Sequence, residues 1–370
     1  MKAGVIKAYI LKEFTELVRT RLIILVYLLP SMILILFGYG IKMEVKDVRT
    51  VILDYDKSKL SYQIISAFEH SKYFSPKVLN ISEKEALSLM KKAKIDVIVI
   101  IPESFEKNLL KGIGSEIGIF IDASFPFRGL TIQSYAEGLL YNEASKLLPP
   151  DKTGLITVNQ RNLFNQSMRD EDAIVPGLIG IVLLVAPAIL SALVIVREKE
   201  RGTIFNFYSS PVKKSEFVIA KLTPPFLLHS INIFVMFLWA TYLFGVPFRG
   251  SFLTYWITSE VYVMISVGIG LLVSIVARTQ IVAIILTIII TVIPGFLYSG
   301  IIMPISAMKG EASIEAHIFP VMYFNHIIYD TFLIGQGFAS EKNLFYFMIL
   351  LLYALGLLAL GIFLLKKELR

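Results

Sequence analysis

Residues 174–196 read IVPGLIGIVLLVAPAILSALVIV, a run of 23 residues without a charged side chain. The hydrocarbon core of a bilayer is about 30 Å thick, and an α-helix rises about 1.5 Å per residue, so about 20 apolar residues cross it. A run of this length and composition is typical of a membrane-spanning helix. This stretch therefore predicts a span, and the chain holds others like it.

Four further uncharged runs predict spans: Leu22–Ile41, Leu222–Phe244, Ile281–Met303 and Asn343–Leu365. A sixth run, Phe252–Ala277, contains one charged residue, Glu260. Six spans place both termini on the same side of the membrane. The first run is longer than the roughly 7–15 apolar residues of a signal peptide, and no small-x-small cleavage site follows it, so we expect an uncleaved anchor.

The composition supports a membrane protein. Of the 370 residues, 55% are hydrophobic and 18% are charged, whereas a soluble domain has about 45–50% and about 25%. The mean hydropathy is +0.69. The chain has no cysteine, which excludes disulfide bonds, thiolate metal sites and cysteine nucleophiles. The net charge of +7 fits basic loops on the cytoplasmic side, and we expect no nucleic-acid partner.

The distribution of charge predicts the orientation. Residues 1–21 and residues 197–221 each carry a net charge of +3, whereas residues 304–342 carry two basic and four acidic side chains. The positive-inside rule then places both termini and the 197–221 loop in the cytoplasm. By alternation, residues 42–173 lie outside. We expect a multi-pass protein of the cell (inner) membrane.

Residues 42–173 form the one region that resembles a soluble domain. Three β-branched runs predict strands, namely TVILD at 50–54, IDVIVII at 95–101 and GIFID at 118–122. Helical patterns separate them, at Ser82–Ala93 with a capping box, at Pro102–Gly112 and at Leu130–Leu148 before two prolines. The alternation predicts a compact α/β domain. Asp54, Asp56 and Asp122 follow strands, and we interpret them as turn formers and helix caps.

The first 21 residues predict an amphipathic helix that lies in the cytoplasmic interface. The apolar residues fall at helical spacing: Ile6, Tyr9, Ile10, Phe14, Leu17 and Val18. The opposite face carries charged residues, among them Lys12, Glu13 and Glu16. Such a helix rests its apolar face on the membrane and turns its charges to water.

The loop after the second span reads REKERGTIFNFYSSPVKKSEFVIAK, residues 197–221. Charges, a glycine, an aromatic stretch and a proline follow one another. The pattern suits a short surface helix that offers apolar side chains framed by charges to a soluble partner. The alternative is a positively charged anchor and nothing more. The chain lacks a G-x-x-x-x-G-K-[ST] phosphate loop, so any ATP must be hydrolysed by another chain.

This loop resembles the coupling loop of ABC-2 type transporter permeases. Other stretches resemble the same family in order: VILDYDKSKLS at 51–61, IVPGLIGIVLL at 174–184, GIGLLVSIVARTQ at 268–280, and YSGIIMPISAM at 298–308 with IFPVMYFNHIIYDTFLIGQG at 318–337. The subgroup has one span, a large extracytoplasmic domain and then five spans. One departure is Asp330-Thr331, where family members often have Arg-Gly.

The resemblance implies a polytopic α-helical fold with six transmembrane helices and an α/β extracytoplasmic domain between helices 1 and 2. It implies that residues of the loop contact a separate nucleotide-binding ATPase subunit: Glu198, Glu200, Arg201, Gly202, Thr203, Phe205, Phe207, Tyr208 and Pro211. ATP and Mg are bound through that subunit, so this chain is not itself an enzyme. A homodimer or a homologous permease would complete the path for a drug-like or lipid-like substrate. An extracytoplasmic accessory protein is a further expected partner.

Polar residues inside the predicted spans are candidates for a substrate path, because ionisable groups in a membrane by default mark a function. Glu260 lies in the fourth span, and His229 and Asn232 lie three apart in the third. Their alternative role is to hydrogen-bond neighbouring helices. Pro294-Gly295 predicts a helix break, followed by short external re-entrant helices in residues 304–342.

The residues offer no metal site, since the two histidines of the 304–342 segment, His317 and His326, are only a weak hint of one. Two other functions stay open. The first is an ion-gradient-driven transporter that uses Glu260 as a proton carrier. The second is a membrane-anchored receptor whose extracytoplasmic domain binds a ligand.

Overall fold

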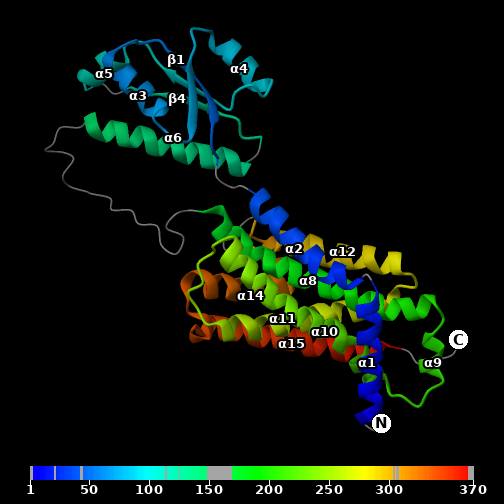
Figure 1. Ribbon diagram of the computed structural model, residues 1–370. Helices are drawn as coiled ribbons and strands as arrows, with labels where there is room; N and C mark the ends of the chain where they lie inside the picture. The colour runs from blue at the N-terminus through cyan, green and yellow to red at the C-terminus, as the bar shows by residue number, and fades with distance from the viewer. Residues whose placement is uncertain are drawn as a thin grey trace. The chain divides into compact units, whose positions relative to one another are not determined.

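The computed structural model describes residues 3–20, 22–41, 45–112, 115–124, 126–147, 169–302, 305 and 308–365. The chain divides into two compact units (Figure 1). Residues 1–41 and 161–370 make a helical unit, and residues 42–160 make an α/β unit. The predicted Pro149-Pro150 helix stop lies outside the described residues.

The helical unit contains long apolar helices joined by short segments. Its α-helices are α1 (Ala3–Arg19), α2 (Leu22–Gly40), α8 (Asp170–Glu200), α9 (Ile204–Tyr208), α10 (Lys214–Leu238), α11 (Phe252–Val276), α12 (Gln280–Leu297), α13 (Glu311–Ile318), α14 (Pro320–Tyr329) and α15 (Glu341–Leu364). Turns of π-helix follow α10 (Trp239–Leu243) and α14 (Asp330–Ile334), and a 3-10 turn (Gly337–Ala339) precedes α15.

Five of these helices are long and apolar enough to cross a membrane within the part of the chain that the structure describes. They are α8, α10 with its π-helical end, α11, α12 and α15. The first predicted span forms α2, which contributes a shorter apolar helix over Val26–Gly40. The unit is therefore that of a polytopic helical membrane protein.

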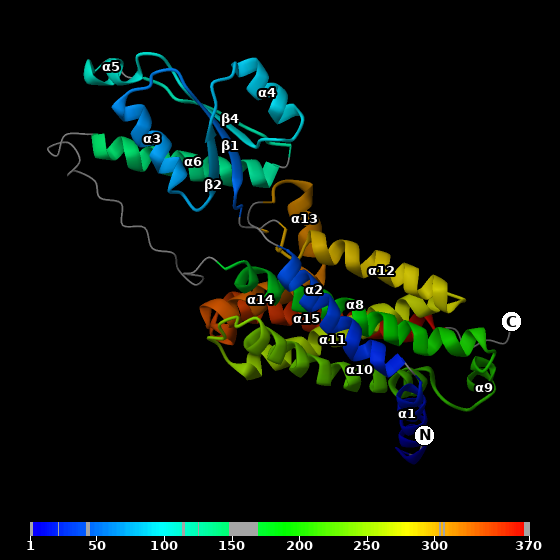
Figure 2. The same cartoon turned by 45° about the horizontal axis from the view of Figure 1, so that its top comes forward.

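Helix α8 occupies the centre of the helical unit and contacts α2, α10, α11, α12 and α14 (Figures 1 and 2). Small residues let α11 approach it closely. A Cβ atom on Gly270 would lie 2.3 Å from the carbonyl oxygen of Ala188, so only glycine fits there. Ser191 donates a hydrogen bond to the carbonyl of Val267, 3.3 Å away. Close contacts through small and hydroxyl side chains are typical of helix packing in membranes.

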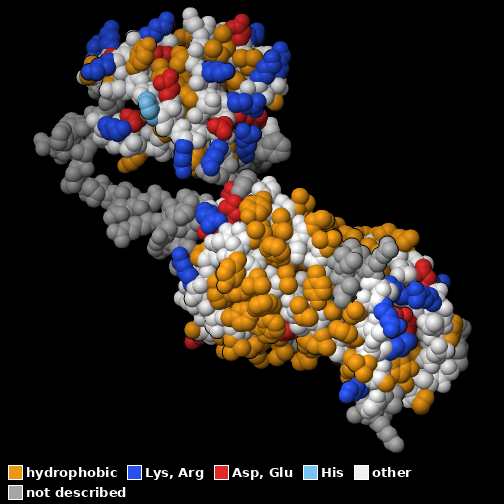
Figure 3. All heavy atoms as spheres, viewed as in Figure 1, with side chains coloured by type: hydrophobic (Ala, Val, Ile, Leu, Met, Phe, Trp, Pro, Cys, Tyr) orange, Lys and Arg blue, Asp and Glu red, His pale blue; other side chains and the backbone are white. Residues whose placement is uncertain are grey.

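The outer helices turn apolar side chains outward. Figure 3 shows hydrophobic side chains gathered in a broad patch across the middle of the visible face of this unit. On α12, Ile281, Ile285 and Ile293 are each more than half exposed, as are Phe345 and Phe363 on α15. A continuous apolar surface of this kind marks contact with lipid or with another apolar protein surface.

The α/β unit is built on a four-stranded sheet of order β2-β1-β3-β4. Its strands are β1 (Val48–Asp54), β2 (Phe74–Val78), β3 (Val97–Ile101) and β4 (Gly118–Ile121). The central strand β1 runs parallel to β2 and β3, and β4 runs antiparallel to β3. The sheet carries apolar side chains on both faces, because helices cover both.

Helices α3 (Lys59–Glu69), α5 (Phe105–Leu110) and α6 (Pro126–Leu147) share one apolar core with the sheet, and α4 (Glu83–Lys91) covers the other face. Figure 2 shows this layering. The three predicted strands overlap β1, β3 and β4, with the second beginning two residues before β3 and the third ending one residue after β4, whereas β2, which contains Pro76, was not predicted. The capping box also forms, since Ser82 Oγ accepts from the backbone N–H of Glu85 at 3.2 Å.

The aspartates at the strand ends shape turns. Asp54 accepts from the backbone N–H groups of Asp56 and Lys57 at 3.1 and 3.0 Å. Asp56 in turn accepts from the N–H of Glu106, the second residue of α5, at 3.0 Å. Asp122 accepts from Ser124 N–H at 3.0 Å. These bonds fulfil the capping roles expected of them.

The helix break expected at Pro294-Gly295 lies three residues later. Both residues are inside α12, which ends at Leu297. Proline lacks an N–H and so loses the bond to the preceding turn, but its carbonyl still accepts. The N–H of Tyr298 donates to Pro294 O at 2.9 Å, which carries the helix one turn beyond the proline.

Candidate functional site

The loop of residues 197–221 forms a tight corner between two long helices. Helix α8 ends at Glu200, and Gly202 follows with a φ of +73°, in the left-handed region. Glycine adopts this conformation at no steric cost and commonly ends a helix. The corner leads into the five-residue helix α9 and then to α10.

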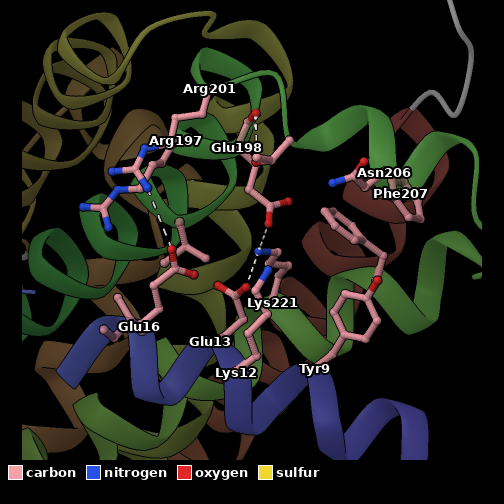
Figure 4. Close-up of a pocket in the computed structure, with 14 residues that line it drawn as sticks. Tyr9, Lys12, Glu13, Glu16, Arg197, Glu198, Arg201, Asn206, Phe207 and Lys221 are labelled. Carbon is pink, nitrogen blue, oxygen red and sulfur yellow. Dashed lines mark hydrogen bonds and ion pairs between the residues drawn. The ribbon is translucent and has the colours of Figure 1, made fainter. Parts of the chain in front are cut away.

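A buried cluster of charges joins three helices at this corner. Lys221 in α10 is 1% exposed, and its Nζ donates to Oε1 of Glu13 in α1 and to Oε1 of Glu198 in α8. Figure 4 shows Lys221 between the two carboxylates. Lysine is almost never fully buried unless it is paired. We call Glu13, Lys221 and Glu198 the charge triad.

The place of Glu13 corrects the expectation for α1. It was assigned to the water-facing side of the helix, but its side chain is 5% exposed. Leu17, four residues on, is also buried, whereas Phe14 and Val18 are 37% and 45% exposed. Helix α1 therefore packs its Glu13–Leu17 face against α10. Burial raises the pKa of the Glu13 carboxyl, and the ammonium of Lys221 offsets only part of that effect.

Lys199 binds the end of a different helix. Its Nζ donates to the carbonyl oxygens of Ser274, Ile275 and Ala277, at 3.1 Å for Ile275 and 3.4 Å for Ala277. These carbonyls belong to the last turn and C-cap of α11, where the helix supplies no N–H partner. A lysine at a helix C-terminus also interacts favourably with the helix dipole.

The next two charges make exposed contacts. Glu200 accepts from the side-chain amide of Gln280, the first residue of α12. Arg201 lies 3.8 Å from Glu16 of α1, and the two side chains are 60% and 43% exposed. Pairs as exposed as Arg201 and Glu16 contribute about 0.2–1 kcal/mol. Thr203 donates to the Glu198 carbonyl at 3.4 Å and helps to close the corner.

Helix α9 divides its aromatic residues between the interior and the surface. Phe207 is buried and stacks on Phe217 of α10, with ring centroids 4.0 Å apart. Phe205 is 48% exposed, and Tyr208 is half-buried beside it with ring centroids 5.8 Å apart. Pro211 is exposed. The structure thus leaves Phe205, and not Phe207, as the exposed phenylalanine of α9.

A cleft of about 180 Å³ lies between α1, the end of α8, α9 and the start of α10. Residues of both charges and several aromatic rings line it: Tyr9, Lys12, Glu16, Arg197, Arg201, Asn206, Phe207 and Phe217, with the charge triad at its wall. Figure 4 shows Arg201 reaching toward Glu16 across the cleft. The cleft separates the amphipathic helix from α9.

The intramembrane polar residues divide into two groups. The amide of Asn232 donates to the carbonyl of Val26 in α2 at 2.9 Å and lies 3.3 Å from Nδ1 of His229. Both side chains are fully buried, and Nε2 of His229 and Oδ1 of Asn232 have no partner. Glu260 is half-buried on α11 and accepts from Ser230 of α10 at 2.8 Å. His229 and Asn232 therefore face α2, and Glu260 faces α10.

The described residues include no group of three histidine, cysteine or acidic side chains placed to hold a metal ion. His317 and His326 each have another neighbour: His317 Nδ1 lies 2.7 Å from the Ser313 carbonyl, and the His326 ring packs against Tyr346.

A sequence profile of the family described as "ABC-2 family transporter protein" matches residues 20–365. The chain belongs to the ABC-2 family. This confirms the resemblance found in the sequence, and the matched range contains the 197–221 corner and the five helices that are long and apolar enough to cross a membrane. The ABC-2 chain is a multi-pass membrane protein of the permease type.

Relatives that are named as permeases match between 62% and 90% of this chain. "Probable multidrug ABC transporter permease YbhS" of Escherichia coli K12 is 28% identical over 338 residues, 90% of this chain and 89% of that protein. "Probable multidrug ABC transporter permease YbhR" of the same organism is 24% identical over 327 residues, 87% and 88% of the two chains. "Inner membrane transport permease YhhJ" is 21% identical and covers 62% of each chain.

Asp330, which departs from the family pattern, has a structural partner in this ABC-2 chain. It is buried at the start of the π-helix after α14 and accepts from the amide of Asn343 in α15 and from the N–H of Gln336 at 3.3 Å. Sequence reasoning did not find this pair or the charge triad. A buried lysine gives no signal in a sequence, because lysines near membranes are common in loops.

Proposed function

We propose that this chain is the permease subunit of an ATP-driven exporter, and that α9 is the element on which a separate ATPase subunit docks. The observation that carries this proposal is the corner at 197–221. A short helix with one exposed aromatic side chain, Phe205, projects next to charges that contact α1, α10, α11 and α12. A soluble motor that moves α9 has a direct mechanical route into the helical unit.

The proposed topology has six spans, with α2 as the first, in the inner membrane. Both termini and the 197–221 corner are cytoplasmic, and the α/β unit is extracytoplasmic. The charge distribution supports this arrangement, because the segments of residues 1–21 and 197–221 are both positive. The name of the relative YhhJ, an inner membrane transport permease, supports a location in the inner membrane.

The proposed substrate is a hydrophobic or amphipathic molecule, drug-like or lipid-like, that leaves the cytoplasm or the membrane. Two relatives with coverage near nine-tenths are named for multidrug transport. Glu260, half-buried on α11, is the polar residue best placed to meet such a substrate in a path, and His229 with Asn232 is a second candidate.

ATP and Mg are bound by the partner subunit, so this chain is not an enzyme. The path requires a second permease, either another copy of this chain or a homologue. An accessory extracytoplasmic protein docks on the α/β unit in this proposal. We propose no role for nucleic acid.

The test is capture of an ATPase by the tagged permease. The tagged chain is expressed in its host cell and purified in detergent, and the bound proteins are assayed for ATPase activity. We expect an ATPase to be recovered with wild type. Recovery should fall at least about tenfold for Phe205→Glu, because a buried aromatic anchor is worth about 2 kcal/mol or more in an interface.

A matched control is Tyr62→Glu, which changes a 69% exposed aromatic residue of the α/β unit and should leave recovery unchanged. Failure of wild type to bind any ATPase, with export that follows an ion gradient, would instead support a gradient-driven transporter. Ligand binding to the α/β unit without any export would support a receptor.

A further inference from the structure

Four consecutive residues at the end of α8 contact different neighbouring helices. Glu198 bonds Lys221 of α10, Lys199 bonds the end of α11, Glu200 bonds Gln280 of α12, and Arg201 lies near Glu16 of α1. The side chains of one helical turn point in different directions, since successive residues are rotated by about 100°. One turn therefore touches the helices that surround α8 at this end.

The four contacts differ in strength. The pairs made by Glu200 and Arg201 are exposed to solvent and contribute little. Glu198 is 16% exposed and Lys199 is half-buried, and each makes charge-assisted bonds. Glu198 joins α8 to α10 and α1, whereas Lys199 is the only one of the four that holds α11.

Helix α11 is fastened to α8 at two levels. In its middle, Ser266 donates to the carbonyl of Leu184, and Gly270 packs on Ala188. At its end, the ammonium of Lys199 binds carbonyls that no helical N–H can reach. An ammonium has three N–H donors, and three carbonyls meet it here. Val273 and Ala277 at this end of α11 also pack with Ala192 and Val196 of α8, and among the described residues Lys199 adds the hydrogen bonds that tie the last carbonyls of α11 to the corner.

We propose that Lys199 is a positioning residue that makes α11, the helix of Glu260, move together with α9. This inference rests on the proposed function, because it needs an ATPase that moves α9. When α9 and the end of α8 shift, Lys199 draws the last turn of α11 along, and the packing at Gly270 transmits the shift along the helix. Loss of the ammonium separates the two motions.

The chain has no cysteine, so labels can be placed by single substitutions. Phe363 of α15 is 79% exposed and serves as the reference position. One doubly labelled protein carries Ser209→Cys with Phe363→Cys and reports on α9. A second carries Val276→Cys, at a residue 74% exposed at the end of α11, with Phe363→Cys. Spin-label distances are measured in the complex with the ATPase, without nucleotide and with ATP and vanadate.

In wild type we expect ATP to change both distances. In Lys199→Met we expect the α9 distance to change as in wild type and the α11 distance to stay constant. Export should fall at least about fivefold, a typical coupling effect, while basal ATPase activity remains. Lys199→Arg keeps a cation with several donors and should restore the α11 change.

Lys199→Gln keeps an N–H donor without the charge, and it replaces Lys199→Met should that variant fail to assemble with the ATPase. Arg278→Gln is the matched control, because it removes an exposed cation from the segment that directly follows the C-cap of α11. It should move both distances as wild type does. If loss of any positive charge were the cause, the α11 distance would stay constant in Arg278→Gln as well as in Lys199→Met. That result would overturn the role of Lys199.

Two further outcomes separate this inference from the proposed function. The role of Lys199 would be refuted if the α11 distance changed equally in wild type and Lys199→Met. It would also be refuted if α9 moved in wild type while the α11 distance stayed constant. Both outcomes leave the proposed function standing. An α9 distance that is insensitive to ATP in wild type would refute the proposed function, and this inference with it.

Discussion

The hydroxyl of Ser230 donates a hydrogen bond to the carboxylate of Glu260 across the α10–α11 contact, with 2.8 Å between the oxygen atoms. Ser230 follows His229 directly in the chain, yet the two residues face different helices. Residue 229 is fully buried on the α2 side, whereas Ser230 reaches toward α11. The polar residues of the third span therefore serve two separate contacts.

Replacement of Glu260 tests whether it belongs to a substrate path. We expect Glu260→Gln to reduce export of cationic substrates more than that of neutral ones, because the amide keeps the shape and the bond to Ser230 but cannot carry a charge. ATPase binding should be unchanged. Ser230→Ala is the control that removes the bond alone. Unchanged export of every substrate by both Glu260→Gln and Glu260→Leu would make Glu260 a structural residue, and would also remove the main support for gradient-driven transport.

The charge triad should be required for the stability of the end of the helical unit that contains the 197–221 corner. We expect Lys221→Met to lower the free energy of unfolding by about 3–5 kcal/mol, because it takes the ammonium away from the buried carboxylate of Glu13 and the largely buried carboxylate of Glu198. Thermal unfolding in detergent micelles measures this. Lys214→Met, on the first turn of the same helix, should have little effect. The triple variant Glu13→Leu, Lys221→Met and Glu198→Gln should recover most of the loss; if it stays as unstable as the single variant, the charges are not the cause.

Gly202 should be required for its backbone conformation and not for space. A Cβ atom there would meet nothing within 4 Å, but the φ of +73° disfavours most side chains by about 1–2 kcal/mol. We expect Gly202→Val to uncouple ATPase activity from export, while Gly202→Asn, which tolerates this region, stays near wild type. Wild-type export by a stably expressed Gly202→Trp protein would show that the corner has no part in coupling.

Asp96 should make the stability of the α/β unit depend on pH. Burial opposes its ionisation, but hydrogen bonds from the side chain and N–H of Arg49 and the charge of Arg128 outweigh this and lower the pKa of Asp96. Because the folded pKa is below the unfolded value of about 3.9, the stabilisation is present above that pH and disappears as the pH falls through the folded pKa.

The measurement is hydrogen exchange in β1 and β3 of the full chain, corrected for the intrinsic exchange rate. Asp96→Asn should reduce protection at pH 6, and the difference from wild type should vanish at the lowest pH. Asp122→Asn, which weakens only the local bonds that residue 122 accepts from Ser124, should reduce it less. A difference that persists unchanged to the lowest pH would show that ionisation of Asp96 is not what stabilises the sheet.

The proposed orientation predicts which residues react from outside intact cells. A cysteine at Ser134, exposed on α6 of the α/β unit, should react with an impermeant thiol reagent. A cysteine at Ser209, exposed after α9, should react only in opened membranes. The native chain has no cysteine, so no background labelling interferes. Labelling of Ser209 from outside would reverse the topology.

The helices and strands could largely be predicted, because their signals are local. Uninterrupted apolar runs of about 20 residues have few alternatives to a membrane helix, and the 95–101 run is apolar on both faces because helices cover both sides of β3. β2 was missed because FSPKV is short and has a proline at its centre. Proline is tolerated there because β2 is an edge strand.

The sequence by itself determined that this chain is a polytopic membrane protein of the ABC-2 family with an α/β unit between its first two apolar runs. Composition and motif order are properties of the chain, and they do not depend on which helices meet. Only the tertiary structure decided that Lys221 lies between Glu13 and Glu198, residues 208 and 23 positions away, and that Phe207 turns inward while Phe205 turns outward. The reason is physical: a charge near a membrane is stable either in water or beside an opposite charge, and only the packing of the helices brings that opposite charge within reach.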